Sequence, residues 1–263
     1  MTSIFLFAHQ DDEYGIYTML LNSVSKGENV ICVYFTDGGK PKQRNSESLK
    51  IMKHIGINED NVYFVGDILK IPDGRLIDFM SPAFEWLSVL FSSLRNIKSI
   101  YIPSWEGGHP DHDALHAITA LVCSRARIIS RVKQFPLYNS DKCCKPFFKV
   151  FHPILHNGDI EKIFIPPSNR LRFLRYCLSY PSQKTTWLGL FPFVLFHYIF
   201  FGNQLLQSFS LERIYVRPHS GLLYYEQREF CSWSRMTEAI RELSLAKGMV
   251  EYTTKSSPVI ESS

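Results

Sequence analysis

Residues Ser3–Glu13 have the sequence SIFLFAHQDDE, in which a short apolar run passes directly into a polar cluster. The apolar part has the length of a buried strand, and a helical pattern of apolar residues follows over Tyr14–Val24. A second apolar run, Asn29–Phe35 (NVICVYF), is closed by Thr-Asp-Gly-Gly. Continuous apolar strands that alternate with amphipathic helices are typical of a parallel sheet covered on both faces. We therefore expect an α/β fold with a Rossmann-like, doubly wound, mostly parallel sheet.

The alternation continues and then weakens from about Arg125. The expected elements are a helix over Ser46–Ile55, a strand over Asn61–Val65, a helix over Pro82–Leu94, a strand over Ser99–Pro103, a helix over Asp111–Ser124 and a helix over 171–180. We expect a catalytic core over residues 1–135, a C-terminal extension or lid over 136–252 that completes the core and covers the active site, and a flexible tail over 253–263.

Composition narrows the class of protein. The chain has 263 residues, of which 45% are hydrophobic, so a substantial core can form. Its net charge of +4 falls short of the clustered excess of a nucleic-acid binder, and we expect no nucleic-acid partner. The N-terminus has the pattern of neither a signal peptide nor a membrane anchor. Six cysteines without C-x-x-C spacing predict free thiols and a cytoplasmic protein.

Two polar clusters follow strands of the predicted sheet. One is His9–Glu13 (HQDDE), after the first strand, and the other is Gly107–His116 (GGHPDHDALH), after the fourth. In an open parallel sheet, ligands bind at the carboxyl ends of the strands. Folding is therefore expected to bring together residues that lie about a hundred positions apart in the chain.

Histidine mixed with carboxylates suits zinc, because three protein ligands leave a fourth position for water. The ion lowers the pKa of that water to about 7, and a free carboxylate beside it can act as general base. The spacing leaves the ligand set open, since His112 and His116, four residues apart on one helical face, form a competing pair. Acidic residues that only complement a helix dipole are the simpler alternative.

The two clusters together resemble a known family. Ala-His-Gln-Asp-Asp-Glu at Ala8–Glu13 with Gly-His-Pro-Asp-His at Gly108–His112 is similar to the LmbE-like/PIG-L family of zinc-dependent N-acetylglucosaminyl deacetylases. The likeness covers residues 3–125 well and the remainder in fragments. Weaker matches are Thr36–Gly39, Arg44 with Glu47, and Tyr180–Gln183; Gln10 departs from the pattern, because the family usually has proline there.

The resemblance implies a role for each matching residue. It makes His9, Asp12 and His112 the ligands of one zinc ion per chain, Asp11 the general base and His109 the group that stabilises the oxyanion and can protonate the leaving amine. It further implies that Asp111 orients a histidine ligand, that Arg44 and Gln183 contact the substrate, and that His116 is structural. For Arg44, a surface ion pair with Glu47 is an equally weighted alternative.

The implied reaction removes the N-acetyl group from an N-acetylated amino sugar, of the N-acetylglucosamine type, in a glycoconjugate. Two alternatives remain: a zinc amidase that acts on another amide, such as a thiol conjugate or an antibiotic intermediate, and a binding protein that has kept the fold without activity. A Rossmann nucleotide-binding protein ranks low, because no G-x-G-x-x-G follows the first strand.

One apolar segment, Trp187–Phe201 (WLGLFPFVLFHYIFF), falls outside these motifs. Its 15 residues are fewer than the roughly 20 that span a bilayer, and Pro192 is expected to interrupt a helix within it. A buried core element is the first interpretation. The second is an aromatic surface beside the basic stretch Arg170–Arg175, suited to a lipid-linked substrate or to peripheral contact with an anionic membrane.

Overall fold

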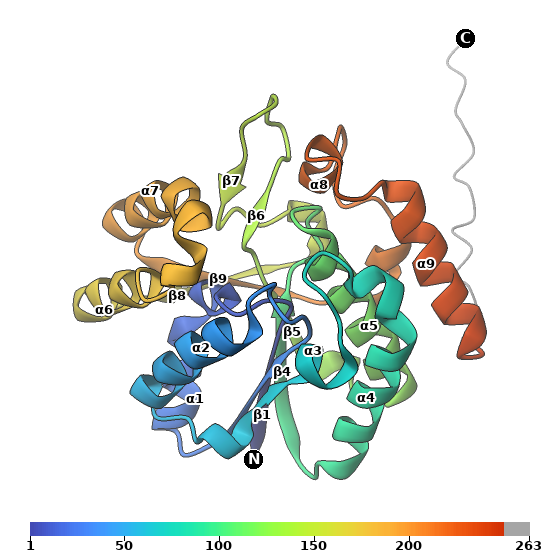
Figure 1. Ribbon diagram of the computed structural model, residues 1–263, viewed down its shortest axis with the longest axis horizontal. Helices are drawn as coiled ribbons and strands as arrows, with labels where there is room; N and C mark the ends of the chain where they lie inside the picture. The colour runs from blue at the N-terminus through green and yellow to red at the C-terminus, as the bar shows by residue number, and fades with distance from the viewer. Residues whose placement is uncertain (250–263) are drawn as a thin grey trace.

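A computed structural model of the chain describes residues 1–249; the predicted tail over 253–263 lies outside the described residues. A seven-stranded sheet in the order β3-β2-β1-β4-β5-β9-β8 forms its centre (Figure 1). The first five strands of that order are parallel, and β9 and β8 are antiparallel to their neighbours. The predicted fold class is confirmed. The strands are β1 (Thr2–Phe7), β2 (Asn29–Tyr34), β3 (Val62–Phe64), β4 (Ile97–Pro103), β5 (Val132–Phe135), β8 (Ile160–Phe164) and β9 (Asn203–Ser208).

Both faces of the sheet are covered, which explains why the central strands read as continuous apolar runs. In β1, Ile4 and Leu6 belong to one core, and Phe5 and Phe7 belong to the other. The first core packs against α4 (Met80–Ser93), α5 (Pro110–Arg125) and α9 (Trp233–Ala246). The second packs against α1 (Tyr17–Ser25), α2 (Pro41–Ile55), α6 (Pro167–Cys177) and α7 (Lys184–Phe200).

The apolar segment Trp187–Phe201 falls almost entirely within α7, which is continuous, so the predicted interruption at Pro192 is wrong. Proline removes the N–H that would bond to the carbonyl of Leu188, four residues earlier. Both residues are exposed, so water can reach the carbonyl that is left free. Among residues 1–249, no helix is long and apolar enough to cross a membrane.

A two-stranded hairpin rises above the end of the sheet at which β1 and β4 finish (Figure 1). It is formed by β6 (Tyr138–Asn139) and β7 (Lys149–Val150), and it stands between α7 and the short helix α8 (Tyr224–Gln227). Another short helix, α3 (Val65–Leu69), follows β3 directly. These elements form the surroundings of the polar clusters described below.

The close approach of α3 to the loop after β2 predicts a specific instability. A Cβ added at Gly66 would lie 2.1 Å from the carbonyl carbon of Thr36, a backbone atom that cannot rotate away. We expect Gly66→Ala to lower the free energy of unfolding by about 2–4 kcal/mol through overpacking. Gly189→Ala, in the open part of α7 with nothing within 4 Å, is the matched control and is expected to be neutral or slightly stabilising. Urea denaturation of both variants measures the difference, and equal midpoints would contradict it.

Candidate active site

The first polar cluster forms a tight turn at the carboxyl end of β1. The backbone N–H of His9 donates to Asp12 Oδ2 over 2.8 Å, and a 3-10 turn follows over Asp12–Gly15. Asp11, just before that turn, has a φ of 113°. Positive φ is uncommon outside glycine, although aspartate and asparagine tolerate it better than most residues. The turn therefore holds the side chains of His9, Asp11 and Asp12 in one buried group.

The second cluster is the start of α5. Pro110 occupies the first helical turn, as predicted, and His109 is the N-cap residue whose Nδ1 accepts the backbone N–H of Asp111 over 3.2 Å. Asp111 is anchored in turn by the loop before α4, because its carboxylate accepts the backbone N–H groups of Gly74 and Leu76. The helix start is thus fixed from both sides.

His9, Asp12 and His112 converge although about a hundred residues separate them. His9 Nδ1 lies 3.2 Å from His112 Nε2, and Asp12 Oδ1 lies 3.1 Å from that same His112 nitrogen. The distance from His9 Nδ1 to Asp12 Oδ2 is 3.6 Å. A tetrahedral zinc ion with bonds of about 2.0–2.1 Å holds its ligand atoms roughly 3.3 Å apart. The three residues can therefore hold a zinc ion, and they are buried as a group.

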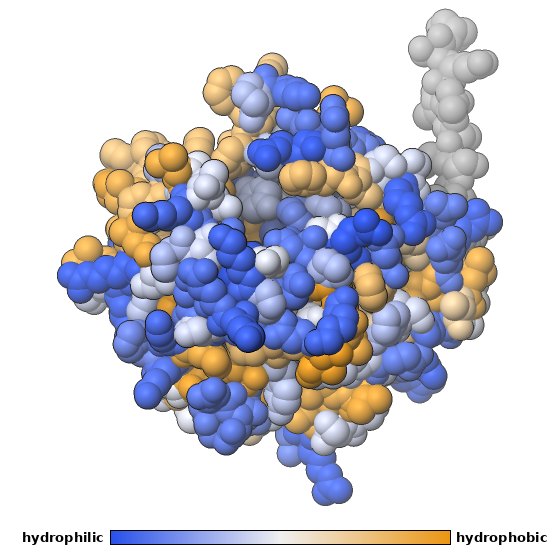
Figure 2. Space-filling view, viewed as in Figure 1, coloured by the Kyte–Doolittle hydropathy of each residue, from blue (hydrophilic) through white to orange (hydrophobic). Residues whose placement is uncertain are grey.

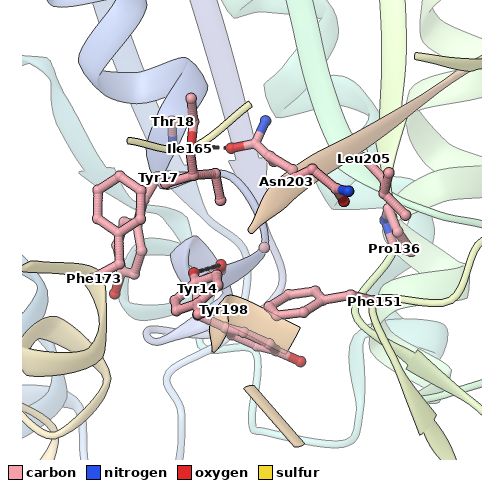
Figure 3. Close-up of a pocket in the computed structure, with 12 residues that line it drawn as sticks. Tyr14, Tyr17, Thr18, Pro136, Phe151, Ile165, Phe173, Tyr198, Asn203 and Leu205 are labelled. Carbon is pink, nitrogen blue, oxygen red and sulfur yellow. Dashed lines mark hydrogen bonds between the residues drawn. The ribbon is translucent and has the colours of Figure 1, made fainter. Parts of the chain in front are cut away.

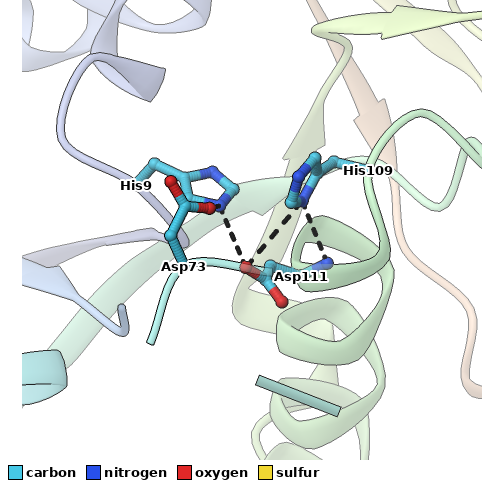
Figure 4. A group of neighbouring side chains, drawn as sticks. All are labelled: His9, Asp73, His109 and Asp111. Atoms are coloured by element: carbon cyan, nitrogen blue, oxygen red, sulfur yellow. Dashed lines mark hydrogen bonds and ion pairs between the residues drawn. The ribbon is translucent and has the colours of Figure 1, made fainter. Parts of the chain in front are cut away.

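The opposite side of the His9 ring faces two carboxylates (Figure 4). His9 Nε2 is 3.0 Å from Asp111 Oδ2 and 3.2 Å from Asp73 Oδ1. Burial lowers the pKa of His9, but Asp73, Asp12 and Asp111 outweigh it and raise the pKa well above its ordinary value. With a cation on the Nδ1 side, Asp111 and Asp73 would hold the ring proton on Nε2 and leave the lone pair of Nδ1 free to ligate.

Asp11 lies beside this group and is paired with an arginine. Its Oδ1 accepts a hydrogen bond of 2.7 Å from Arg44 Nη2. Burial raises the pKa of Asp11 to about 7, against the opposing effect of Arg44. A carboxyl group with a pKa near neutrality can both accept and return a proton, which is what a general base requires.

His109 faces the same space as a neutral ring. Burial, together with the neighbouring His9, lowers its pKa to about 3. Since Nδ1 accepts a backbone N–H, the ring proton must lie on Nε2. His109 therefore presents an N–H donor to the pocket that it lines.

Arg44 is buried, with 2% of its surface exposed, and it lines the pocket. It contacts Asp11 and Asp73, and it also donates to the backbone carbonyls of Gln10 and Gly38. The alternative of a surface ion pair with Glu47 is therefore wrong: Glu47 is itself buried.

The motif Tyr180–Gln183 contacts the first cluster. Tyr180 donates to Glu13 Oε2 over 2.8 Å, and the same carboxylate oxygen accepts the backbone N–H of Asp11 over 2.9 Å. Gln10, at the position where the related family has proline, directs its side-chain nitrogen to Asn45 Oδ1. Gln10 thus points toward α2, away from the three converging side chains.

His116, the competing ligand, lies elsewhere. Its Nδ1 is 2.9 Å from the carbonyl oxygen of Pro103, and the ring packs against Trp105 and Phe209. Among residues 1–249, it joins neither the group His9, Asp12 and His112 nor the second group of possible metal ligands, His9, Asp73, His109 and Asp111. His116 therefore lies apart from His112 in the structure.

Sequence reasoning missed Asp73. It lies in the turn Pro72-Asp73-Gly74, whose composition is that of an ordinary turn. In the structure it contacts both His9 and Arg44, and those neighbours hold the pKa of its carboxyl below the ordinary value. Its place at the carboxyl edge of the sheet, after β3 and α3, is the signal that could have marked it.

A pocket of about 490 Å³ opens above these residues. This volume lies within the usual range for small-molecule sites. The floor is polar, and the upper wall comes from the hairpin, α7 and the region of α8. The lining includes His9, Asp11, Asp12, Arg44, Asp73 and His109 on the floor, and Tyr138, Phe148, Gln183, Leu190, Tyr224 and Phe230 on the wall.

A second cavity is lined by Tyr14 and by further aromatic side chains that include Phe151, Phe173 and Tyr198 (Figure 3). Its free volume of about 10 Å³ is room for about one water molecule. It is too small for a substrate, and the larger pocket is the candidate active site.

Comparison with solved structures supports the fold. A deacetylase from the biosynthesis pathway of teicoplanin is 12% identical with a TM-score of 0.57, covering 79% of this chain and 97% of its own. An N,N'-diacetylchitobiose deacetylase from Pyrococcus horikoshii is 15% identical with a TM-score of 0.54, covering 80% of this chain and 82% of its own. A conserved protein of Thermus thermophilus is 17% identical with a TM-score of 0.54, covering 79% of this chain and 92% of its own. At these identities the likeness establishes the fold alone.

The sequence comparison is more specific. No match was found among curated proteins. The family model PIG-L, described as GlcNAc-PI de-N-acetylase, matches residues 4–123. This range contains the converging side chains of His9, Asp12 and His112 as well as Asp11 and His109. The predicted resemblance to the PIG-L family is therefore confirmed over residues 4–123.

Proposed function

We propose that this protein is a zinc-dependent hydrolase that removes the acetyl group from an N-acetylated amino sugar in a glycoconjugate. The observation that carries the proposal is the convergence of His9 and Asp12, which line the floor of the pocket, with the buried His112. The match of residues 4–123 to the PIG-L family model, described as GlcNAc-PI de-N-acetylase, supports the reaction type. The cytoplasmic location expected from the cysteines stays a prediction.

The residues fit the ion by their chemistry. Three lone-pair donors from His9, Asp12 and His112 face one another at about the spacing of a tetrahedral site, and the carboxylates of Asp73 and Asp111 lie behind His9. Without a cation, two imidazole nitrogens 3.2 Å apart would have to share one proton beside a carboxylate. A zinc ion in this position would supply a water acidic enough to ionise near neutral pH and a positive charge for the amide oxygen.

The neighbouring side chains can carry the proton transfers. We assign Asp11 as the group that takes a proton from the attacking water, because its pKa of about 7 suits reversible transfer. The Nε2–H of His109 would donate to the amide oxygen as negative charge develops there. Protonated Asp11 can then return its proton to the amide nitrogen, so that the C–N bond breaks and acetate and a free amine are released. His109, neutral and with a low pKa, is a poorer acid for that step.

The floor and wall of the pocket suit a sugar. The partly exposed carboxylate of Asp73 offers acceptors for hydroxyl groups, and Arg44 beside it holds that carboxylate in place at the floor of the pocket. The aromatic rings of Tyr138, Tyr224 and Phe230 on the wall provide apolar surface for a sugar ring or its substituent. We therefore assign Arg44 and Gln183 to substrate binding and extend that set to Asp73.

The experiment that tests the function is acetate release. Zinc-loaded protein would be given a panel of free, nucleotide-linked, lipid-linked and polymeric N-acetylhexosamines, together with N-acetylated amines that are not sugars. Release of acetate from at least one of them is the expected result. If acetate were released only from an amide that is not a sugar, the amidase alternative would replace the proposal; if nothing were hydrolysed, the binding-protein alternative would stand.

Gln183 offers a test of substrate binding apart from chemistry. It lines the pocket at the start of α7, and its Oε1 accepts a hydrogen bond from Thr186. We expect Gln183→Ala to raise KM about five-fold with little change in kcat, since one neutral hydrogen bond contributes about 1 kcal/mol. Steady-state kinetics with the best substrate of the panel measures this. Asn58→Ala, an exposed amide outside the pocket, is the control; an unchanged KM for Gln183→Ala would remove this residue from the site.

A further inference from the structure

Helix α7 presents an apolar face to solvent. Leu188, Phe196 and Phe200 recur along it at helical spacing, and Leu188 is 81% exposed and Phe200 67% exposed. The opposite side of the helix, through Trp187 and Val194, packs into the core of the sheet. The exposed side chains therefore contribute little to folding, although apolar groups of this size are normally removed from water.

The apolar surface continues beyond the helix. Phe196 lies 4.5 Å from Phe200 and 6.1 Å from Phe201 between ring centroids. Figure 2 shows hydrophobic residues gathered over α7 and α6 at the upper left of the molecule. A cluster of this kind on one side of a protein marks an interaction site more often than chance exposure. We name it the α7 surface, made of Phe164, Leu188, Phe196, Ile199, Phe200 and Phe201.

The net positive charge of the chain comes from residues 138–201, the segment that includes α7. Residues 138–201 contain 8 Lys and Arg and 3 Asp and Glu, a net charge of +5. The chain as a whole contains 29 Lys and Arg and 25 Asp and Glu. The residues outside this segment therefore contain 21 Lys and Arg and 22 Asp and Glu, a net charge of −1. The overall charge of +4 therefore comes from the segment that carries the α7 surface. Lys142 and Lys145 on the hairpin, and Arg175 and Lys184 beside the helices, are exposed.

The hairpin packs against α7, so the exposed lysines of the hairpin lie near the apolar α7 surface. The rings of Phe148 on the hairpin and Phe193 on α7 are 5.1 Å apart. Phe147, next to Phe148, is exposed near the tip. The same two elements supply Phe148, Gly189 and Leu190 to the wall of the pocket. The α7 surface is thus continuous with the mouth of the candidate active site.

We propose that the α7 surface binds the interface of an anionic lipid membrane, with α7 lying in the plane of the headgroups. The apolar side chains that face outward from α7 can enter the boundary between headgroups and acyl chains, and the exposed basic residues of the hairpin and α6 would supply the charge that interfacial segments carry. Anionic lipids attract each nearby basic residue, which complements the excess charge of residues 138–201. Docking in this orientation would bring the mouth of the pocket to the lipid surface.

The test is sedimentation with vesicles of phosphatidylcholine alone or with phosphatidylserine added. We expect the protein to sediment with the anionic vesicles only, and less at high salt. Phe196→Asp/Phe200→Asp should lower the partition coefficient at least ten-fold. Lys142→Gln/Lys145→Gln should lower it about five-fold for each lysine. None of these four residues lines the pocket, so acetate release from a water-soluble substrate should be unchanged.

Matched controls lie on other parts of the molecule. Val89→Asp changes an exposed apolar residue of α4, on the other face of the sheet, and Lys26→Gln/Lys53→Gln removes two exposed lysines outside the segment. Both should sediment like the unaltered protein. Circular dichroism checks folding, and Leu188→Asp repeats the test at the most exposed position of α7 should the double variant misfold.

Three results would overturn the proposal. The first is a failure of the unaltered protein to sediment with anionic vesicles. The second is equal loss of sedimentation in the α7 variants and in the controls. The third is a dimer, by light scattering, that Phe196→Asp/Phe200→Asp converts to monomers without any vesicle binding, which would make the α7 surface a contact between copies of this chain. Vesicle binding requires no catalysis, so the proposed hydrolase could fail independently.

Discussion

His112→Ala is expected to abolish metal binding and, with it, hydrolysis. The purified protein should contain about one zinc ion per chain, because His9, Asp12 and His112 supply three convergent ligands. Removing the imidazole of His112 leaves two ligands and an open space in a buried site. His9→Ala should have the same effect. Metal content by mass spectrometry after dialysis, with acetate release in parallel, measures both losses.

His116→Ala is the matched control, since it removes the same side chain one turn further along α5. His116 bonds to the carbonyl of Pro103 and packs against Trp105, so its loss should lower stability while the metal stays bound. If His116→Ala lost the metal and His112→Ala retained it, the assigned ligand set would be wrong. Full metal content in both His9→Ala and His112→Ala would remove this site altogether.

The parallel half of the fold could be predicted because its strands are buried on both faces. The predicted strand over Asn29–Phe35 corresponds to β2 to within one residue, and the predicted helix over Asp111–Ser124 corresponds to α5 to within one residue at each end. Local boundaries were less predictable. The predicted helix over Tyr14–Val24 begins as a 3-10 turn, because the hydrogen bonds of Asp11 and Glu13 shape the chain there.

The antiparallel end of the sheet could not be predicted. Strand β8 (IEKIF) lies at the edge, and four of its five residues are exposed. A charged, exposed edge strand has no apolar run to reveal it, although such composition protects the edge from pairing with other chains. Strand β9 lies between β8 and β5 in the sheet, although β5 is far from β9 in the sequence. Pairing between strands so far apart in the sequence leaves no local pattern that could predict it.

In the candidate site, too, residues that belong to a sequence motif could be predicted, and residues placed only by the path of the folded chain could not. His9, Asp12 and His112 carry motifs and follow predicted strands, so their meeting could be expected. Asp73 carries no motif, and its contact with His9 arises only from the path of the loop between α3 and α4. Similarly, Tyr180 matched a fragment of a motif, but only the structure reveals its bond to Glu13 beneath Asp11.

Asp11→Asn and Asp12→Asn should separate catalysis from metal binding. Asp11→Asn is expected to keep the zinc and to lower kcat by about 10²–10⁴, the range for loss of a positioned general base. Asparagine tolerates the positive φ of Asp11 and can still accept the hydrogen bond of Arg44, so the turn should stay intact.

Asp12→Asn makes the same chemical change at the next residue, but it replaces the carboxylate that lies 3.1 Å from His112 Nε2. We expect it to weaken zinc binding first, and activity only as the metal is lost, so that excess zinc restores part of the rate. Zinc titration combined with single-turnover acetate release distinguishes the two variants. If Asp11→Asn lost the metal while Asp12→Asn kept it and lost catalysis, the two carboxylates would have exchanged roles, and Asp11 would be the ligand.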